Sequence, residues 1–374
     1  MSIGAVQTQF FKLGHPFSLE SGETLDPLIL AYETYGELNA DASNAVLLMH
    51  ALTGSQHAAG HNPTVEGVGH LWTEECHVGW WDAFIGPDKA LDTDKYFVIC
   101  ANYLGSCYGS TGPASINPAT GKRYGYTFPR ITAWDVVNSQ LKLLDHLKIS
   151  CLHGVIGGSL GGMLSMLLAI RCPERVRHVV PMATGMETTV LQKILNFEQI
   201  VAIRNDKTFQ EGAYDPAYPP RQGLTLARMI SHKTFVSLRD LERRARSEII
   251  PHKLIGNFYG LSHPVESYVL YQGEKFSQRF DANCYLRIMD IWQNFQLPDS
   301  DNRFSQCTGQ RYLVFSINSD VCFYPEEQLA IVDALKAQKI DVTYLTVHSE
   351  LGHDSFLLEP ELYSPYIQFL LNGH

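Results

Sequence analysis

The chain lacks a long apolar run, a cluster of basic residues and a leader-like start. Among its 374 residues no uninterrupted apolar stretch reaches about 18 residues, the length that a membrane-spanning helix requires. The formal charge is −10 and no run of lysines or arginines occurs, which argues against an electrostatic nucleic-acid interface. The first residues do not combine a basic segment with an apolar one. We therefore expect a soluble, cytoplasmic protein with neither a membrane nor a nucleic acid as partner.

Motifs for disulfides, phosphates and metals are also missing. The eight cysteines are scattered without a C-x-x-C pair, which predicts reduced, mostly buried thiols. No G-x-x-x-x-G-K phosphate loop occurs. Five histidines between positions 50 and 77 raise the alternative of a zinc site, but no cysteine or carboxylate stands at the usual ligand spacing and H-E-x-x-H is absent. We expect no bound metal and no bound cofactor.

What the chain does contain is an alternation of short apolar segments with helical patterns. The helical pattern over 132–147 starts at Thr132, with Asp135 three residues on as a capping partner, and 325–338 starts with a proline. Continuous rather than alternating hydrophobicity in the apolar segments predicts a mostly parallel sheet covered on both faces, an α/β fold. The predicted strands are 27–36, 44–52, 96–105, 154–159, 176–184, 311–318 and 342–350.

The pattern changes from 188 to 297. Helical segments there (190–203, 223–232 and 282–292) are separated by loops rich in proline, tyrosine and glycine, and the strand pattern resumes afterwards. An insertion fits this order better than a tandem domain. We predict a core domain formed by 1–187 and 298–374, with a helical lid at 188–297.

One serine lies between glycines at the junction of a predicted strand and a predicted helix. Gly157-Gly158-Ser159-Leu160-Gly161 matches G-x-S-x-G, the pattern of a nucleophile elbow. Small neighbours let the strand and helix approach closely, and the strained turn exposes the hydroxyl at the helix N-terminus. The alternative is a glycine-rich turn without a reactive residue.

A serine nucleophile needs a base and an acid that orients it, in the chain order Ser, Asp or Glu, His for this elbow. Asp320 and His353 follow two late predicted strands, at the sheet edge where active sites of such folds collect. We predict that His353 accepts the proton of Ser159 and that Asp320 orients the imidazole. The backbone amides of Leu52, after an early strand, and of Leu160, after the serine, are the predicted oxyanion donors.

Seven longer motifs are distinctive: HALTGSQHAAG (50–60), GWWDAFIGPDKALDTDKYFVICAN (79–102), LGSCYGSTGPASINPATG (104–121), GGSLGGM (157–163), GLTLARMISH (223–232), VESYVLYQGEKFSQRFDANCYL (265–286) and LGHDSF (351–356). Together they resemble the homoserine O-acetyltransferase family of α/β-hydrolase-fold acyltransferases. The resemblance runs over nearly the whole chain. It implies the α/β-hydrolase fold, transfer of acetyl from acetyl-CoA, as co-substrate, to L-homoserine in methionine biosynthesis, and a homodimer built through the lid helices.

The resemblance also implies residue roles. It supports the same nucleophile, triad partners and oxyanion donors. It adds Arg228, which matches the family arginine for the amino acid carboxylate, and Asp354, which matches the acid for the amino group. A planar guanidinium suits bidentate carboxylate binding. Taken alone, an arginine on a helix is usually solvated and an aspartate in a loop often caps a turn.

Three positions depart from the family pattern. Phe235 stands where many members have tyrosine, so a hydroxyl near the substrate is lost. Ile200 stands where several relatives have arginine. The segment 321–325 has one residue more than the common pattern, which would shift the loop that holds Asp320.

Other functions remain open at the level of sequence. Within the family, the donor can be succinyl-CoA and the acceptor can be serine. Outside it, an esterase or lipase uses the same triad, because nothing in the triad excludes water as the acceptor. A non-catalytic binding module on this scaffold is the third alternative, and labelling of Ser159 by a fluorophosphonate would exclude it.

Overall fold

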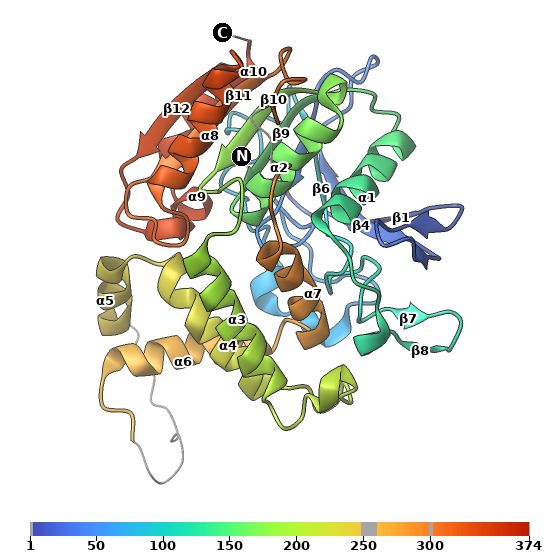
Figure 1. Cartoon of the computed structure of the whole chain (residues 1–374), viewed down its shortest axis with the longest axis vertical. Coiled ribbons are helices and arrows are strands. Elements are labelled where there is room, and N and C mark those ends of the chain that lie inside the picture. Colours follow the sequence, from blue (N-terminus) through green and yellow to red (C-terminus); the bar gives the residue numbers. More distant parts are fainter. Residues whose placement is uncertain (1–2, 248–259, 299–301, 374) are drawn as a thin grey trace.

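The computed structural model describes residues 3–247, 260–298 and 302–373, and their centre is an eight-stranded sheet (Figure 1). From edge to edge the strands are β1 Gln9–Lys12, β4 Ile29–Tyr35, β6 Phe97–Ala101, β5 Ala45–Met49, β9 Leu152–Gly158, β10 Val176–Met182, β11 Arg311–Ile317 and β12 Asp341–Val347. In this order, the six strands from β6 to β12 are mutually parallel. Strand β4 is antiparallel to β6, and β1 is antiparallel to β4. All seven predicted strands are present, and the predicted α/β fold is confirmed.

Both faces of this sheet are buried, which explains why its strands read as continuous apolar runs. In β9, Val155 belongs to one hydrophobic cluster and the next residue, Ile156, to the other. Helices α1 (Ala133–His146), α2 (Leu160–Arg171) and α8 (Pro325–Ala337) cover the first face. Helix α10 (Pro360–Leu371) covers the second, together with the loop around Trp81. Successive side chains of a strand point to opposite faces, so a strand covered on both sides needs apolar residues at every position.

The helix starts follow the predicted local chemistry. The hydroxyl of Thr132 accepts a hydrogen bond from the Asp135 amide at 3.3 Å, and the Asp135 carboxylate accepts one from the Thr132 amide at 2.7 Å. This reciprocal pair satisfies donors that the first turn of α1 would otherwise leave free. Pro325 opens α8, where the missing N–H costs nothing.

The described helices between β10 and β11 form a layer beside the sheet, at the bottom of Figure 1: α3 Val190–Arg204, α4 Arg221–Phe235, α5 Leu238–Ser247, α6 Pro264–Ser277 and α7 Ala282–Gln293. Helix α4 packs on α3 and α6, α5 packs on α6, and α3 packs on α7. Helix α4 also contacts the 3₁₀ turn Gly352–Asp354, so this layer reaches the end of the sheet where His353 lies. The predicted lid contains these helices, and its exact boundaries stay a prediction. Residues 248–259 of the lid lie outside the described residues. The same is true of residues 1–2, 299–301 and 374 of the predicted core.

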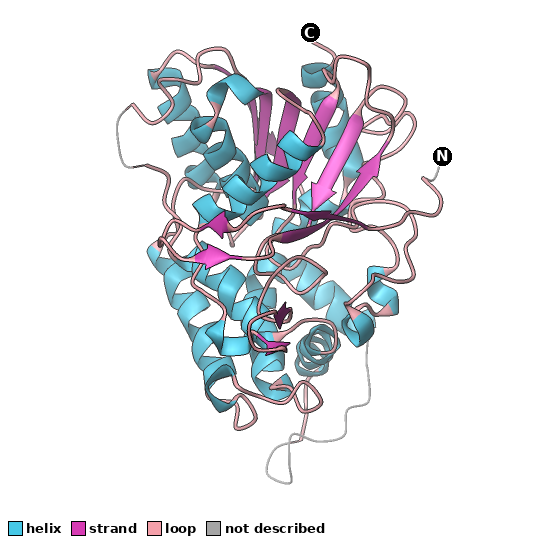
Figure 2. Ribbon diagram, turned by 90° about the vertical axis from the view of Figure 1, so that its right-hand side faces the viewer, coloured by secondary structure: helices cyan, strands magenta, loops and turns pink. Residues whose placement is uncertain are grey.

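Small elements complete the chain (Figure 2). They include the strand pairs β2 Phe17–Ser18 with β3 Thr24–Leu25 and β7 Ile116–Asn117 with β8 Lys122–Arg123, and helix α9 Ser355–Leu358. The short 3₁₀ turns are Gly69–Leu71, Glu74–Cys76, Gly125–Thr127, Pro173–Arg175, Gln210–Gly212 and Gly352–Asp354. No helix within the described ranges has both the length and the apolar character needed to cross a membrane.

Candidate active site

Ser159 occupies a sharp turn between β9 and α2. Its φ of 58° and ψ of −128° lie in a region that residues other than glycine rarely adopt, and it directly precedes the first residue of the helix. Two contacts hold the turn: the Ser159 amide donates to the Met182 carbonyl at 2.9 Å, and the Ser159 carbonyl accepts from the Thr184 hydroxyl at 2.7 Å. The serine is therefore presented by a fixed backbone at a helix N-terminus, as the G-x-S-x-G pattern predicts.

The glycines around Ser159 provide space. A Cβ atom on Gly157 would lie 2.3 Å from the backbone of Gly161, and one on Gly161 would lie 2.0 Å from the carbonyl oxygen of Met49. A Cβ atom on Gly158 would lie 2.4 Å from the ring of Phe356. None of these glycines needs a left-handed backbone, so close packing of strand, helix and neighbouring loop explains them.

His353 and Asp320 form a buried pair at the ends of β12 and β11. Nδ1 of His353 donates to Oδ2 of Asp320 at 2.7 Å. The other carboxylate oxygen accepts the amides of Cys322, at 2.7 Å, and Phe323, at 3.0 Å. The segment after Asp320, in which the resemblance implies one extra residue, thus folds over the carboxylate and donates to it; the shift expected for this loop relative to other family members stays a prediction. Nε2 of His353 is buried and has no hydrogen-bond partner among the described residues.

Aromatic rings surround the imidazole of His353. Phe323 stacks on it with ring centres 5.5 Å apart, Phe356 meets it edge to face at 5.3 Å, and Phe235 lies 6.0 Å away. Burial alone would lower the pKa of His353, but the charge and hydrogen bond of Asp320, with a smaller contribution from Asp354, raise it overall. The arrangement stabilises the imidazolium that forms when His353 accepts a proton.

The two predicted oxyanion donors lie near Ser159. Leu160 is the first residue of α2, and Leu52 lines the same pocket as Ser159. Neither backbone amide donates to another group in the described part of the chain. The loop before Leu52 is fixed by His50, whose ring stacks on Tyr103 at 3.7 Å and whose carbonyl accepts the Tyr103 hydroxyl at 2.6 Å. Burial lowers the pKa of His50 to about 4, so this histidine is neutral near pH 7.

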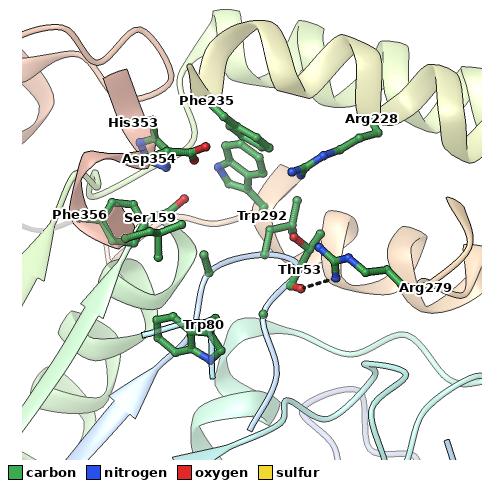
Figure 3. Close-up of a pocket in the computed structure, with 14 residues that line it drawn as sticks. Thr53, Trp80, Ser159, Arg228, Phe235, Arg279, Trp292, His353, Asp354 and Phe356 are labelled. Carbon is green, nitrogen blue, oxygen red and sulfur yellow. Dashed lines mark hydrogen bonds between the residues drawn. The ribbon is translucent and has the colours of Figure 1, made fainter. Parts of the chain in front are cut away.

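Arg228, from α4, and Asp354, beside the catalytic candidate His353, line the same cavity of about 180 Å³ (Figure 3). Neither side chain makes a hydrogen bond, and they form no ion pair with one another, within the residues that the structure describes. The guanidinium of Arg228 instead lies 5.1 Å from the ring centres of both Phe235 and Phe276. Burial raises the pKa of Asp354, although His353 and Arg228 oppose this. A guanidinium and a carboxyl group thus face the cavity, and neither is engaged in a hydrogen bond within the described residues.

Sequence reasoning missed several residues of this cavity. Arg279 supplies a second guanidinium, and Trp80 and Trp292 supply apolar walls. Arg279 lies inside one of the motifs that carry the resemblance. It stands in the connection between two helices, where the periodicity of the sequence does not indicate which side chains point inward. Of the departures, Phe235 lines the cavity, whereas Ile200 packs against the hydrophobic core instead.

The histidines that raised the zinc alternative have other partners. His57 is buried, and both ring nitrogens are engaged: Nδ1 with Oε2 of Glu33 at 2.7 Å and Nε2 with the His77 carbonyl at 3.0 Å. In residues 3–247, 260–298 and 302–373 no cluster of three or more His, Cys, Asp or Glu side chains has the arrangement of a metal site. The expectation of no metal stays a prediction.

The strained serine turn, the ordered histidine and aspartate and the sheet topology define an α/β-hydrolase-fold protein, and residues 44–360 match the α/β hydrolase fold family. Sequence relatives are more specific. The chain is 42% identical to a homoserine O-acetyltransferase of Methanohalobium evestigatum, covering all of this chain and 74% of the relative. It is 41% identical to one from Geobacter metallireducens, covering all of this chain and 98% of the relative. The chain belongs to the homoserine O-acetyltransferase family.

Three further similarities show the range of activities among proteins with this fold. A protein of Nitrosomonas europaea named homoserine O-succinyltransferase is 41% identical, over all of this chain and 97% of its own length. Among solved structures, homoserine O-acetyltransferase from Bacillus anthracis superposes with a TM-score of 0.87 at 27% identity, covering 98% of both chains. Esterase E22 superposes with the same TM-score at 26% identity, covering 98% of this chain and all of its own.

Proposed function

We propose that this protein is a homoserine O-acetyltransferase that carries acetyl from acetyl-CoA to L-homoserine through an acetylated Ser159, the reaction implied for methionine biosynthesis. The observation that carries the proposal is the combination, in one cavity, of Ser159 and His353 with the Arg228 guanidinium and the Asp354 carboxyl group, neither of which makes a hydrogen bond or ion pair within the described residues. An ester hydrolase needs the first two groups only. The added charges complement a free amino acid, which has one carboxylate and one ammonium group.

In the first half-reaction, Ser159 attacks the thioester carbonyl while Nε2 of His353 accepts its proton. The amides of Leu52 and Leu160 donate to the oxyanion of the tetrahedral intermediate. The carbon–sulfur bond then breaks, the thiol of CoA leaves with the proton from His353, and acetyl-serine remains. Acetyl-CoA is a co-substrate in this scheme, and no bound cofactor or metal is needed.

In the second half-reaction, the homoserine hydroxyl takes the place of CoA. Arg228 binds its carboxylate and Asp354 its ammonium group, which orients the hydroxyl toward the acetyl carbon. His353 accepts the hydroxyl proton, the new ester bond forms, and the proton returns to Ser159 as O-acetylhomoserine leaves.

Two alternatives have specific support. Relatives at 41% identity are named homoserine O-succinyltransferase, so succinyl-CoA is the second candidate donor, with homoserine or serine as acceptor. Esterase E22 shares the fold at a TM-score of 0.87, so hydrolysis is the third candidate.

One experiment separates these candidates. Purified protein is offered acetyl-CoA or succinyl-CoA, each with homoserine, with serine or with no amino acid, and released thiol and product mass are followed. We expect fast thiol release only with acetyl-CoA and homoserine, absence of activity in Ser159→Ala, and a strong loss in Arg228→Ala. Equal thiol release without an amino acid would overturn the transferase proposal in favour of a thioesterase.

The assembly and location are further parts of this proposal. Helix α3 buries the polar side chains of Gln192, Asn196 and Gln199 and exposes Ile194 and Phe197, by 51% and 60%. Exposed apolar side chains along one helix face are typical of an interface, which supports a homodimer through the lid helices. We place the protein in the cytoplasm, where acyl-CoA and free amino acids are available.

A further inference from the structure

We propose that Arg279 is a second binding residue for the α-carboxylate of the acceptor amino acid, acting together with Arg228. This inference rests on the proposed transferase function and deepens it. Arg279 lies between α6 and α7 and lines the cavity that contains Ser159, Arg228 and Asp354. Figure 3 shows both arginines reaching the cavity from the helical layer, opposite Ser159 and His353.

The first argument is that both guanidinium groups contact the same aromatic ring, that of Phe276. The guanidinium carbon of Arg228 lies 5.1 Å from the ring centre of Phe276, and that of Arg279 lies 5.2 Å from the same ring centre. Burial, followed by the like charge of Arg279, lowers the pKa of Arg228. The pKa of Arg279 is itself raised, because Tyr108 and Glu75 outweigh the effect of its burial. Both groups are therefore cations, and an anion bound in the cavity that both line is attracted by the two charges.

The second argument is that Arg279 is held in place with bonding capacity to spare. The Tyr108 hydroxyl donates to the Arg279 carbonyl at 2.8 Å and accepts from its Nη1 at 2.9 Å, so one buried phenol fixes both backbone and side chain. Nη1 also donates to the Thr53 carbonyl at 3.5 Å. Nη2 makes no hydrogen bond within the described residues, and a planar guanidinium with free donors suits a carboxylate.

The third argument is charge balance. Among the described residues that line the cavity, two arginines face a single aspartate, Asp354. Glu75 lies 3.6 Å from Nε of Arg279, beyond hydrogen-bond distance, and it also lies 3.5 Å from Nζ of Lys275. An acidic side chain that is shared by two cations compensates Arg279 only in part. The cavity therefore keeps an excess of positive charge, which matches a carboxylate beyond what Arg228 alone would bind.

The test compares Arg279→Gln and Arg279→Lys with a matched control, Lys275→Gln. Lys275 approaches the same glutamate but does not line the cavity. Each variant is assayed with acetyl-CoA and homoserine, with acetyl-CoA and 3-aminopropan-1-ol, which is homoserine without its carboxylate, with succinyl-CoA and homoserine, and for acylation by p-nitrophenyl acetate without an acceptor.

We expect Arg279→Gln to lower kcat/KM for homoserine by about ten- to hundred-fold, mainly through KM, because a charge-assisted hydrogen bond is lost. Arg279→Lys should recover part of this loss and Lys275→Gln should show none. Reactions with 3-aminopropan-1-ol and p-nitrophenyl acetate should change by less than about threefold, since neither contains the carboxylate.

Three outcomes would overturn the inference. A similar loss in p-nitrophenyl acetate acylation would mean that Arg279 acts by holding the loop of Thr53 and Leu52. A loss confined to succinyl-CoA would mean that it binds the acyl donor. An Arg279→Gln enzyme as active as Lys275→Gln would leave it without a role. If the unaltered enzyme transfers nothing to homoserine, the proposed function itself fails, which is a distinguishable result.

Discussion

The guanidinium of Arg228 lies against the ring of Phe235, with 5.1 Å between its central carbon and the ring centre. Phe235 follows Arg228 on the same helix, so α4 carries both the cation and an aromatic surface that orients it. A cation over an aromatic face is attracted by the ring quadrupole, and this attraction does not need a hydroxyl group on the ring.

Replacement of Phe235 by leucine should therefore weaken acceptor binding. We expect KM for homoserine to rise about three- to tenfold, because about 1 kcal/mol of cation–π attraction is lost. Phe235→Tyr keeps the ring and should stay within about twofold. Steady-state kinetics at saturating acetyl-CoA measure both, and an unchanged KM in Phe235→Leu would contradict the orienting role.

The pH dependence of acylation follows from His353. Its neutral form is the base, and its pKa is raised by Asp320 against the effect of burial, so activity should fall as pH decreases through a value above the ordinary histidine pKa of about 6.5. Asp320→Asn removes the main raising influence and should move this limb to lower pH while it reduces the rate by about 10⁴. The pH profile of p-nitrophenyl acetate acylation tests this, and an unshifted limb in Asp320→Asn argues against the assignment.

Stability should depend on the space at Gly161. A methyl group there would lie 2.0 Å from the Met49 carbonyl oxygen, and both sites belong to backbone that is held in the sheet and helix. We expect Gly161→Ala to lower the free energy of unfolding by about 2 kcal/mol or more. Gly309→Ala is the control, because no atom lies within 4 Å of its added methyl group. Urea denaturation compares the two, and equal midpoints would show that the elbow relaxes easily.

Glu33 is a second buried acid on which stability should depend. Its Oε1 accepts from Thr8, at 2.7 Å, and Asn62, at 2.9 Å, while Oε2 accepts from His57, at 2.7 Å, and Tyr35, at 2.8 Å. Glu33→Gln replaces one acceptor by an NH₂ group that faces donors. We expect a loss of about 3–5 kcal/mol, compared with less than about 0.5 kcal/mol for the exposed Glu23→Gln.

The same glutamate predicts an acid limit of stability. Burial alone would raise the pKa of Glu33, but hydrogen bonds and charge from His57, with Thr8 and Asn62, lower it overall. A group whose folded pKa is lowered stabilises the fold above its unfolded pKa of about 4.3, and this contribution disappears as pH falls below that value toward the folded pKa. Urea midpoints measured between pH 7 and pH 3 should decline there in the unaltered protein and decline less in Glu33→Gln.

The assembly prediction is tested on the exposed face of α3. Ile194→Glu and Phe197→Glu each place a charge in the proposed interface, and we expect them to convert a dimer into a monomer in analytical ultracentrifugation. Lys207→Glu, an exposed change beyond the end of α3, should leave the dimer intact. A monomeric unaltered protein would refute the proposed interface.

The sequence predicted the sheet because strands that are buried on both faces are apolar throughout, as Val155 and Ile156 illustrate. It did not predict α10, in which Pro365 lies inside the helix, or the short strand β1, which is largely exposed. It also did not reveal that β4 runs antiparallel, because local pattern carries no direction.

For the candidate site, chain order located Ser159, Asp320 and His353, and the resemblance added Arg228 and Asp354. Arg279 was not predicted, because the role proposed for it depends on Tyr108, which is 171 residues away in sequence and becomes its partner only in the folded chain. Hydrophobic periodicity in the sequence does not reveal residues that act through such distant contacts.

The two arginines and the candidate catalytic residues lie on different parts of the chain. Arg228 and Arg279 come from the helices between β10 and β11, whereas the candidate nucleophile, base and acid lie at ends of β9, β12 and β11. Substitutions in one continuous stretch of the gene can thus alter how the acceptor carboxylate is bound while the acylation machinery stays untouched. Asp354, the proposed partner of the ammonium group, lies outside that stretch, beside His353. A chimera that carries the corresponding helices of an esterase would be the direct trial of this modularity.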